Sequence, residues 1–255
     1  MKRVFVDPSA IKGDTINISD KQQKNHLLHV LRMTKGDSIL VLDGAGTEYI
    51  SEISEETKNG LILKIISSKP FISTSKIEVT IFQGIPKGQK MDDIVRKSTE
   101  LGVHRIVPLE TARVIGDSNY GTFAKKIERF RRIAEEASKQ SQRGDIPEVS
   151  APVSLTKAGE MIAGDRSEFD LAILLYELED GLTLKQALRT YVSNTEVRDR
   201  QKIALFIGPE GGFEESEAEL LTTCSAVSVT VGDTILRTET AGPAALAMLS
   251  YEFEL

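Results

Sequence analysis

Hydrophobic and polar residues alternate along the first part of the chain. Glycine-containing sequences at 43–46 and 58–60 divide this part, as expected of turns between strands. One helix is predicted over residues 20–33, because Leu27, Leu28 and Leu31 share a helical face. The strand candidates, recognised by alternation and β-branched residues, are 3–6, 38–42, 48–53 and 61–66. The pattern predicts a small β domain over residues 1–72.

Strand and helix patterns alternate in the rest of the chain, after a Pro- and Ser-containing linker at 69–76. Apolar runs of strand length lie at 77–82, 106–109, 171–177, 203–207 and 227–231. Helical patterns occupy 91–101, 120–142 and 180–191, and an Ala- and Leu-rich helix follows the last strand. This alternation is typical of an α/β domain with a parallel sheet. We predict that the second domain covers residues 73–255.

Acidic and basic residues are unevenly distributed between these domains. The net charge is −6 at pH 7, yet the first 150 residues carry a net charge of +4. This asymmetry is compatible with an RNA-facing front and an acidic back. A solvated surface of mixed charge explains it equally well, so charge leaves both interpretations open.

Cysteine and histidine usage argues against disulfides and metal sites. The single Cys224 has no internal disulfide partner, which suits a reducing compartment. His26 and His29 lack a supporting cysteine cluster, so we expect structural roles and no metal. The N-terminus lacks the apolar segment of a signal peptide, and the apolar runs are too short to span a bilayer. We therefore expect a cytoplasmic protein with no membrane partner.

Two polar stretches follow buried strands near the C-terminus. The strand at 203–207 leads into Gly-Pro-Glu-Gly-Gly (208–212), and the strand at 227–231 leads into a Gly-Asp turn and Leu-Arg-Thr-Glu-Thr (236–240). Ligands bind outside the carboxyl ends of strands in α/β sheets, and glycines let them approach the backbone. The spacing matches neither a dinucleotide-binding nor a Walker loop. Taken alone, each stretch is also explained as an ordinary strand–turn–helix.

The last helix carries its own expectations. Thr238 or Thr240 is expected to cap its N-terminus with a side-chain oxygen. Pro243 is expected in its first turn, where the missing N–H costs no hydrogen bond.

Residues 207–212 (IGPEGG) and 235–241 (ILRTETA), in this order and separation, resemble the RsmE family. Its members are 16S ribosomal RNA uridine-N3 methyltransferases of the knotted SPOUT superfamily. Residues 87–109 are similar to the family's characteristic block, and residues 25–37 to its PUA-like, RNA-binding barrel. The resemblance implies an N-terminal PUA-like β-barrel and a C-terminal SPOUT α/β domain whose deep trefoil knot binds S-adenosylmethionine. It also implies a homodimer through the knotted domain and 16S ribosomal RNA of the small ribosomal subunit as partner.

The resemblance implies a set of site residues. Arg237, or an arginine from the basic first part of the chain, is expected to stabilise the uridine anion, and Glu239 to hold Arg237 in place or to act as a base. Cofactor contacts are expected from the three strand ends: Leu175, Tyr176, Glu177, Ile207, Gly208, Pro209, Glu210, Gly211, Gly212, Val231, Gly232, Ile235, Leu236, Thr238 and Thr240. The RNA contacts expected are Arg3, Arg32, Lys87, Lys90, Lys97, Gln140 and Arg143.

Three places depart from the family pattern. His29 stands where many members have an arginine, which weakens a phosphate contact because imidazole is a poorer cation at pH 7. Thr111-Ala112-Arg113 replaces Ser-Glu-Arg, so any role for a carboxylate there is lost. Gly242-Pro243 stands where alanines are common, and this difference is expected to shift the start of the last helix by a turn.

Other functions remain open from the sequence. A SPOUT methyltransferase acting on transfer RNA has the same fold, although the N-terminal barrel and the 87–109 block argue against it. A non-catalytic RNA-binding factor is opposed by the intact glycines of 208–212 and by Arg237. A Rossmann oxidoreductase lacks its glycine fingerprint. Binding of S-adenosylmethionine would separate the methyltransferases from the other two classes.

Overall fold

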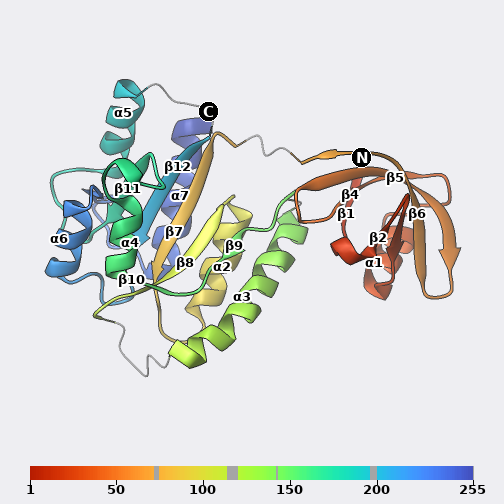
Figure 1. Cartoon of the computed structure of the whole chain (residues 1–255), viewed down its shortest axis with the longest axis horizontal. Coiled ribbons are helices and arrows are strands. Elements are labelled where there is room, and N and C mark those ends of the chain that lie inside the picture. The colour runs from red at the N-terminus through yellow and green to blue at the C-terminus, as the bar shows by residue number, and fades with distance from the viewer. Residues whose placement is uncertain (72–74, 114–119, 142, 196–199, 255) are drawn as a thin grey trace. The chain divides into compact units, whose positions relative to one another are not determined.

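The computed structural model describes residues 1–71, 75–113, 120–141, 143–195 and 200–254. The chain divides into two compact units (Figure 1). The first contains Met1–Thr74 with Ser138–Ile146, and the second contains Ser75–Ala137 with Pro147–Leu255. The segment Ser138–Ile146 thus joins the β unit although it lies far along the chain, a feature that the linear division at residue 72 lacks.

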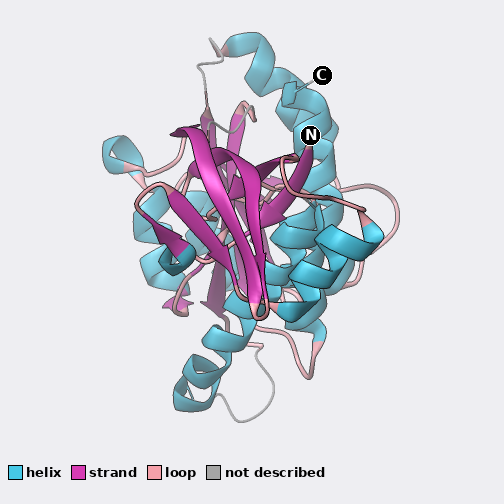
Figure 2. Cartoon of the chain, turned by 90° about the vertical axis from the view of Figure 1, so that its right-hand side faces the viewer, coloured by secondary structure: helices cyan, strands magenta, loops and turns pink. Residues whose placement is uncertain are grey.

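The first unit is built on a six-stranded sheet in the order β1-β4-β5-β6-β3-β2. Figure 2 shows its twisted strands, in magenta, facing the viewer. β1 pairs with β4 in parallel, and the other neighbours are antiparallel. The strands are β1 (Lys2–Phe5), β2 (Ile11–Lys12), β3 (Thr15–Ile18), β4 (Ser38–Leu42), β5 (Thr47–Thr57) and β6 (Gly60–Pro70). The short helices are η1 (Pro8–Ala10), α1 (Lys21–Asn25) and η2 (His26–Val30).

Alternation places one face of this sheet in a core. In β4, Ile39 and Val41 are completely buried, whereas Leu40 between them is partly exposed. They pack with Ile16 and Ile18 of β3, whose alternation with polar residues resembles that of the four predicted strands. Those four strands are confirmed. β2 and β3 were missed, although the Thr-Ile-Asn-Ile pattern of β3 is itself a strand pattern.

The helix predicted over 20–33 is wrong in its second half. The Asp20 carboxylate accepts a hydrogen bond from Gln22 N at 2.8 Å and caps α1. The chain then widens into a π-helical turn, where Leu31 N donates to His26 O at 2.9 Å. Arg32 has a φ of 52°, a left-handed conformation that ends a helix.

The second unit is a seven-stranded parallel sheet, with the order β10-β8-β7-β12-β11-β13 and β9 beside β8. Its strands are β7 (Ile77–Gly84), β8 (Arg105–Glu110), β9 (Glu148–Val149), β10 (Val153–Ser154), β11 (Leu171–Leu175), β12 (Gln201–Ile207) and β13 (Val227–Val229). Its helices are α2 (Lys90–Glu100), α3 (Tyr120–Ser141), α4 (Leu155–Ile162), η3 (Gly164–Arg166), α5 (Leu184–Asn194), α6 (Glu215–Thr223) and α7 (Thr238–Glu254).

This sheet confirms the α/β prediction and shows the spatial order of the strands, which the sequence pattern does not determine. Its central strands are buried on both faces, and the rings of Phe82 in β7 and Phe206 in β12 stack at 4.6 Å between centroids. β12 lies between β7 and β11, although it follows β11 in the chain. All these strands run in the same direction, so their carboxyl ends meet at one edge. The trefoil knot stays a prediction.

Two helix starts differ from the predictions. α5 begins at Leu184 rather than at Asp180, because Thr183 and Gln186 form a reciprocal capping box. α7 begins at Thr238, so Pro243 lies inside the helix and its predicted place in the first turn is wrong. The first turn closes earlier, where Thr240 N and Ala241 N donate to Arg237 O at 2.8 and 2.9 Å.

The described residues contain neither a helix suited to a membrane nor a cluster suited to a metal ion. None of the helices there is both long enough and apolar enough to cross a membrane. In the same part of the chain, no three His, Cys, Asp or Glu side chains gather in an arrangement that could hold a metal ion.

Candidate active site

The ends of β11, β12 and β13 lie level with one another. Leu175 pairs with Ile207 on one side and with Val229 on the other. The loops that follow these strands therefore start side by side. These three loops (176–182, 208–214 and 230–237) form the edge at which the sequence predicted a ligand, and we call them the three edge loops.

Glycine permits the folding of the loop after β12. Gly212 N donates to Pro209 O at 3.0 Å and closes a turn. A Cβ atom on Gly208 would lie 3.0 Å from the Gly212 backbone. Gly212 has a φ of +66°, and a Cβ atom there would meet the Glu177 carboxylate at 1.6 Å. The loop thus doubles back on itself, and glycine suits both the close backbone approach at position 208 and the left-handed conformation at position 212.

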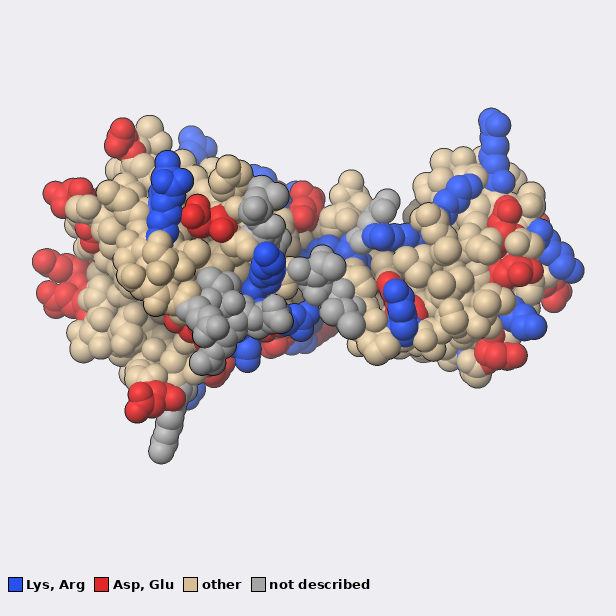
Figure 3. All heavy atoms as spheres, turned by 90° about the horizontal axis from the view of Figure 1, so that it is seen from above, with Lys and Arg blue, Asp and Glu red and all other residues tan. Residues whose placement is uncertain are grey.

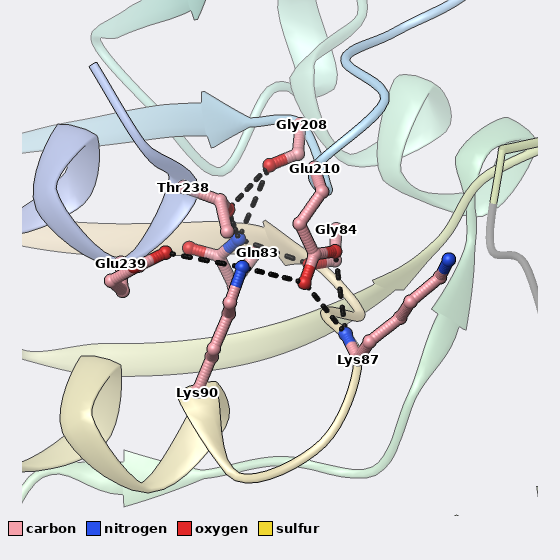
Figure 4. Close-up of polar contacts among 8 residues, drawn as sticks. All are labelled: Gln83, Gly84, Lys87, Lys90, Gly208, Glu210, Thr238 and Glu239. Carbon is pink, nitrogen blue, oxygen red and sulfur yellow. Dashed lines mark hydrogen bonds and ion pairs between the residues drawn. The ribbon is translucent and has the colours of Figure 1, made fainter.

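Gln83, near the end of β7, connects the loop after β12 to the start of α7 (Figure 4). Its side chain is completely buried. Nε2 donates to Gly84 O at 3.0 Å and to Thr238 Oγ1 at 2.9 Å, and lies 3.5 Å from Gly208 O. Thr238 Oγ1 in turn donates to Gly208 O at 2.7 Å. The hydroxyl of Thr238 thus links α7 to the loop after β12, and the prediction that it caps the helix is wrong.

The orientation of the Gln83 amide follows from these partners. Two neighbours are carbonyl oxygens that can only accept, and the Thr238 hydroxyl spends its hydrogen on Gly208 O. The donor end must therefore face them. Its Oε1 atom is buried without a hydrogen-bond partner among the described residues. Sequence analysis missed Gln83, although a glutamine at the end of the apolar run Ile-Phe-Gln-Gly was a signal.

Lys90, the first residue of α2, faces two carboxylates in the same close-up (Figure 4). Its Nζ lies 3.0 Å from Glu210 Oε1 and 3.6 Å from Glu239 Oε2. Glu210 also accepts from Lys87 N at 3.1 Å. The hydrogen bond to Glu210 raises the pKa of Lys90, although burial opposes this. Burial acts to raise the pKa of Glu210, but hydrogen bonds from its own backbone, Lys90 and Lys87 lower it overall. Both groups are therefore charged near neutral pH.

A second set of contacts holds the outer side of the loop after β12. Arg113 Nη1 donates to Gly211 O at 2.5 Å, and Arg113 Nε lies 3.9 Å from Glu214. Ala112 N donates to the buried Glu217 at 2.7 Å. Residues 111–113, where the family pattern is broken, therefore hold the loop through an arginine and a backbone amide. No sequence pattern indicates these partners.

The two predicted catalytic residues lie at the start of α7. Arg237 is exposed, and its guanidinium makes no hydrogen bond or ion pair with the described residues. Glu239 is mostly buried and faces Lys90. No contact joins Glu239 to Arg237 within the described chain, so Lys90 takes the place that the sequence analysis gave to Arg237.

The edge loops offer the groups that S-adenosylmethionine requires. Gly211 is exposed and Gly208 and Gly212 are partly exposed, so their backbone groups are accessible to a ligand. Ile235 and Leu178 are 84% and 72% exposed, and such apolar side chains suit an adenine ring. Glu177 is an exposed carboxylate beside Gly212, able to accept from ribose hydroxyls or an ammonium group. The residues present therefore fit the cofactor.

The predicted cofactor residues do not all share one environment. Tyr176, Val231 and Leu236 are partly exposed, and Gly232 and Thr240 are exposed. Leu175, Ile207, Pro209 and Thr238 are buried. We infer that these buried residues support the loops rather than present side chains to a ligand.

The predicted RNA contacts are divided between the two units. In the first, Arg3, Arg32 and Gln140 are exposed, and Arg143 pairs with Asp145 at 3.0 Å. In the second, Lys87 and Lys97 are exposed. On the face drawn in Figure 3, basic and acidic side chains are interspersed over both units. On this face, the mixture agrees with the solvated-surface interpretation of the charge (Figure 3).

Replacing Gln83 tests the connection beneath the loops. Gln83→Met keeps the shape but removes the donor, so we expect a loss of about 1–3 kcal/mol in the free energy of unfolding. In Gln83→Glu, burial raises the pKa of the new carboxyl group above its unfolded value of about 4.3. Ionisation of this carboxyl group therefore lowers the free energy of unfolding of Gln83→Glu further. This extra loss is absent below the unfolded pKa and grows as the pH rises toward the folded pKa. Urea unfolding at several pH values measures both, and an equal, pH-independent loss in the two variants would contradict the assignment.

Comparisons with known proteins agree with this geometry. A family model described as an RNA methyltransferase domain matches residues 73–250, and one described as an RNA methyltransferase PUA domain matches residues 18–66. Ribosomal RNA small subunit methyltransferase E of Bacillus subtilis (strain 168) is 32% identical over 258 residues, covering 100% of this chain and 98% of the relative. The enzyme of the same name from Synechocystis is 31% identical, over 97% of this chain and 77% of its own.

Solved structures with a similar fold include two that contain S-adenosylmethionine. Ribosomal RNA small subunit methyltransferase E from Neisseria gonorrhoeae, bound to S-adenosylmethionine, superimposes with a TM-score of 0.73 at 28% identity, covering 98% of this chain and 97% of that one. A Legionella pneumophila methyltransferase in complex with the same cofactor gives a TM-score of 0.74 at 27% identity, covering 98% and 96%. Since one family model spans well over half of the chain and the Bacillus relative aligns over all of it, this protein belongs to the ribosomal RNA small subunit methyltransferase E, or RsmE, family.

Proposed function

We propose that this protein transfers a methyl group from S-adenosylmethionine to N3 of one uridine in 16S ribosomal RNA. The observation that carries the proposal is the joining of the two sequence motifs at one sheet edge. Thr238 of the second motif donates to Gly208 of the first at 2.7 Å, and both meet Gln83. The names of the relatives, and the cofactor bound in two similar structures, support the substrate class and the methyl donor.

The cofactor supplies an electrophilic methyl group on a sulfonium centre, so the protein's task is to position and to manage charge. Backbone groups of the edge loops would hold adenine and ribose, and the exposed apolar side chains of Ile235 and Leu178 would suit contact with the ring. Glu177 accepts hydrogen bonds from the polar end. The exposure of these residues supports the assignment.

The nucleophile, uridine N3, must lose its proton before or during transfer. Arg237 is exposed and uncommitted among the described residues, so its guanidinium is available to stabilise the anion that results. Glu239 lies two positions along, where its carboxylate can accept the proton or orient the base. N3 lies on the Watson–Crick edge, so the uridine must be unpaired or flipped out to reach Arg237.

The first unit is proposed to bind the surrounding RNA. Arg3 and Arg32 suit phosphate contacts and base stacking, and Gln140 and Arg143 belong to the same compact unit. Lys87 and Lys97 are proposed to contact RNA from the second unit. We keep the division of the chain near residue 72, with Ser138–Ile146 added to the RNA-binding unit.

Three further features belong to the proposal. The SPOUT domain forms a deep trefoil knot around the edge loops, and two copies of the chain pair through it as a homodimer. A ribosomal substrate places the protein in the cytoplasm. Light scattering coupled to size-exclusion chromatography measures the assembly, and a monomer at working concentration would refute the homodimer.

Methyl transfer to small ribosomal subunits that lack the modification tests the function. Labelled S-adenosylmethionine reports incorporation, and reverse transcription locates it, because methylation at N3 blocks pairing and stops the polymerase. One new stop in small-subunit RNA is the expected result. Incorporation into transfer RNA instead would show that the protein is a methyltransferase of the same fold with a transfer RNA substrate. Absence of cofactor binding would favour the non-catalytic RNA-binding factor.

A further inference from the structure

The sequence placed Lys90 among RNA contacts, but the structure gives it other partners. Its ammonium group lies between the carboxylates of Glu210 and Glu239, at 3.0 and 3.6 Å. The three side chains together carry one negative charge. A phosphate approaching Lys90 therefore meets a site whose positive charge is already compensated, which opposes binding.

The position of Lys90 in its helix also indicates that its carboxylate partners are needed. It is the first residue of α2, where a cation is disfavoured by the helix dipole. Asp92 and Asp93, in the same turn, follow the opposite and favourable pattern. A lysine at this place needs compensating partners, and the two glutamates provide them.

Glu239 depends on Lys90 for its charge balance. Its Oε2 atom is buried and accepts no hydrogen bond from the described residues, and its side chain is 16% exposed. Lys90 is its cationic partner within ion-pair distance in the described chain. A buried carboxylate that loses its cation is costly to keep in place, so removing Lys90 changes where the Glu239 side chain lies.

We propose that Lys90 is a positioning residue for methyl transfer. It links the loop after β12, through Glu210, to the first turn of α7, through Glu239, and so holds Arg237 and Glu239 in register with the cofactor-binding loop. Gln83 makes the corresponding link from below, through Thr238 and Gly208. This proposal rests on the methyltransferase function proposed above.

The two roles of Lys90 predict different kinetics. If Lys90 positions Glu239, Lys90→Met lowers kcat by about 10- to 100-fold, in line with the cost of small misplacements near reacting groups. The KM for ribosomal substrate, the salt dependence of RNA binding and the Kd for S-adenosylmethionine then stay within about twofold of wild type. If Lys90 contacts a phosphate, KM rises, the salt slope falls by about one and kcat is unchanged.

The experiment compares wild type, Lys90→Met, Lys90→Arg and Glu210→Gln in steady-state methylation of unmodified small subunits. Lys90→Arg keeps the positive charge, so its kcat is expected to lie between those of Lys90→Met and wild type. Glu210→Gln removes one carboxylate partner of Lys90 and is expected to lower kcat, as Lys90→Met does. Lys185→Met, an exposed lysine on α5, is the matched control for charge removal. Should Lys90→Met not fold, Glu210→Gln carries the same comparison.

The outcomes separate this inference from the function beneath it. A kcat loss with unchanged RNA binding supports positioning. An unchanged kcat, or a rise in KM alone, overturns it while leaving the methyltransferase intact. Absence of methylation by wild type, despite cofactor binding, refutes the proposed substrate before any variant is compared.

Discussion

Gly84→Ala is expected to lower kcat/KM for methyl transfer by about 100-fold, mainly through weaker binding of S-adenosylmethionine. Gly84 is the last residue of β7 and lies directly beneath the loop after β12. A Cβ atom there would lie 2.6 Å from Pro209 N and 3.0 Å from Gly208 C. These are backbone atoms of a loop that is already folded tightly on itself, so the loop itself must move.

Isothermal titration with S-adenosylmethionine, alongside methylation kinetics, measures this effect. Overpacking of this kind also costs about 1–3 kcal/mol of stability, so assays belong well below the unfolding midpoint. Gly159→Ala, in α4 and outside the edge loops, is the matched control, because the nearest atoms to its Cβ would be side-chain atoms of Leu220 and Cys224, at 3.1 Å. Wild-type cofactor affinity in Gly84→Ala would show that the loop tolerates displacement and that its geometry does not define the cofactor site.

Arg237→Ala is expected to lower kcat by about 100- to 1,000-fold, the cost of removing one donor to a developing anion. The Kd for S-adenosylmethionine should stay unchanged, because the guanidinium is exposed and makes no hydrogen bond or ion pair with the described residues of the edge loops. The fold should also be preserved, since the structural role of Arg237 lies in its backbone carbonyl, which accepts from Thr240 N and Ala241 N.

Single-turnover methylation with saturating cofactor and subunits isolates the chemical step. Arg237→Lys keeps the charge but loses the planar donor pair, so it is expected to fall between wild type and alanine. Lys185→Ala serves as a control for loss of an exposed cation. If Arg237→Ala retained wild-type kcat but raised the KM for RNA, Arg237 would be a substrate-binding residue, and stabilisation of the anion would have to come from another group.

Local pattern predicted the elements of this protein well. β4 was located to the residue, at Ser38–Leu42, and α2 and α3 within one residue at each end. The helix ends that were predicted wrongly also have local causes, but these causes are hydrogen bonds rather than the apolar pattern. The capping box at Thr183 delays α5, and the π-helical turn at His26–Val30 shortens the first helix. Such features depend on a few side-chain and backbone hydrogen bonds rather than on periodicity.

The candidate site was predicted in outline but not in its connections. The motifs at 207–212 and 235–241 were found because glycine, proline and charge follow apolar strands. Their supporting residues were not. Gln83 contacts Thr238 across a separation of 155 residues, and Arg113 contacts Gly211 across 98. A lone glutamine or arginine in a sequence does not identify a partner so distant.

Taken by itself, the sequence determined that the chain forms a β unit followed by a parallel α/β unit, with glycine-containing loops after its last strands. These properties follow from the period of apolar residues and from glycine at strand ends, which are local. Only the tertiary structure decided that β12 lies between β7 and β11, that Ser138–Ile146 joins the first unit, and that Lys90 faces Glu210 and Glu239. Each of these depends on which distant segments pack together, and many arrangements satisfy the same local pattern.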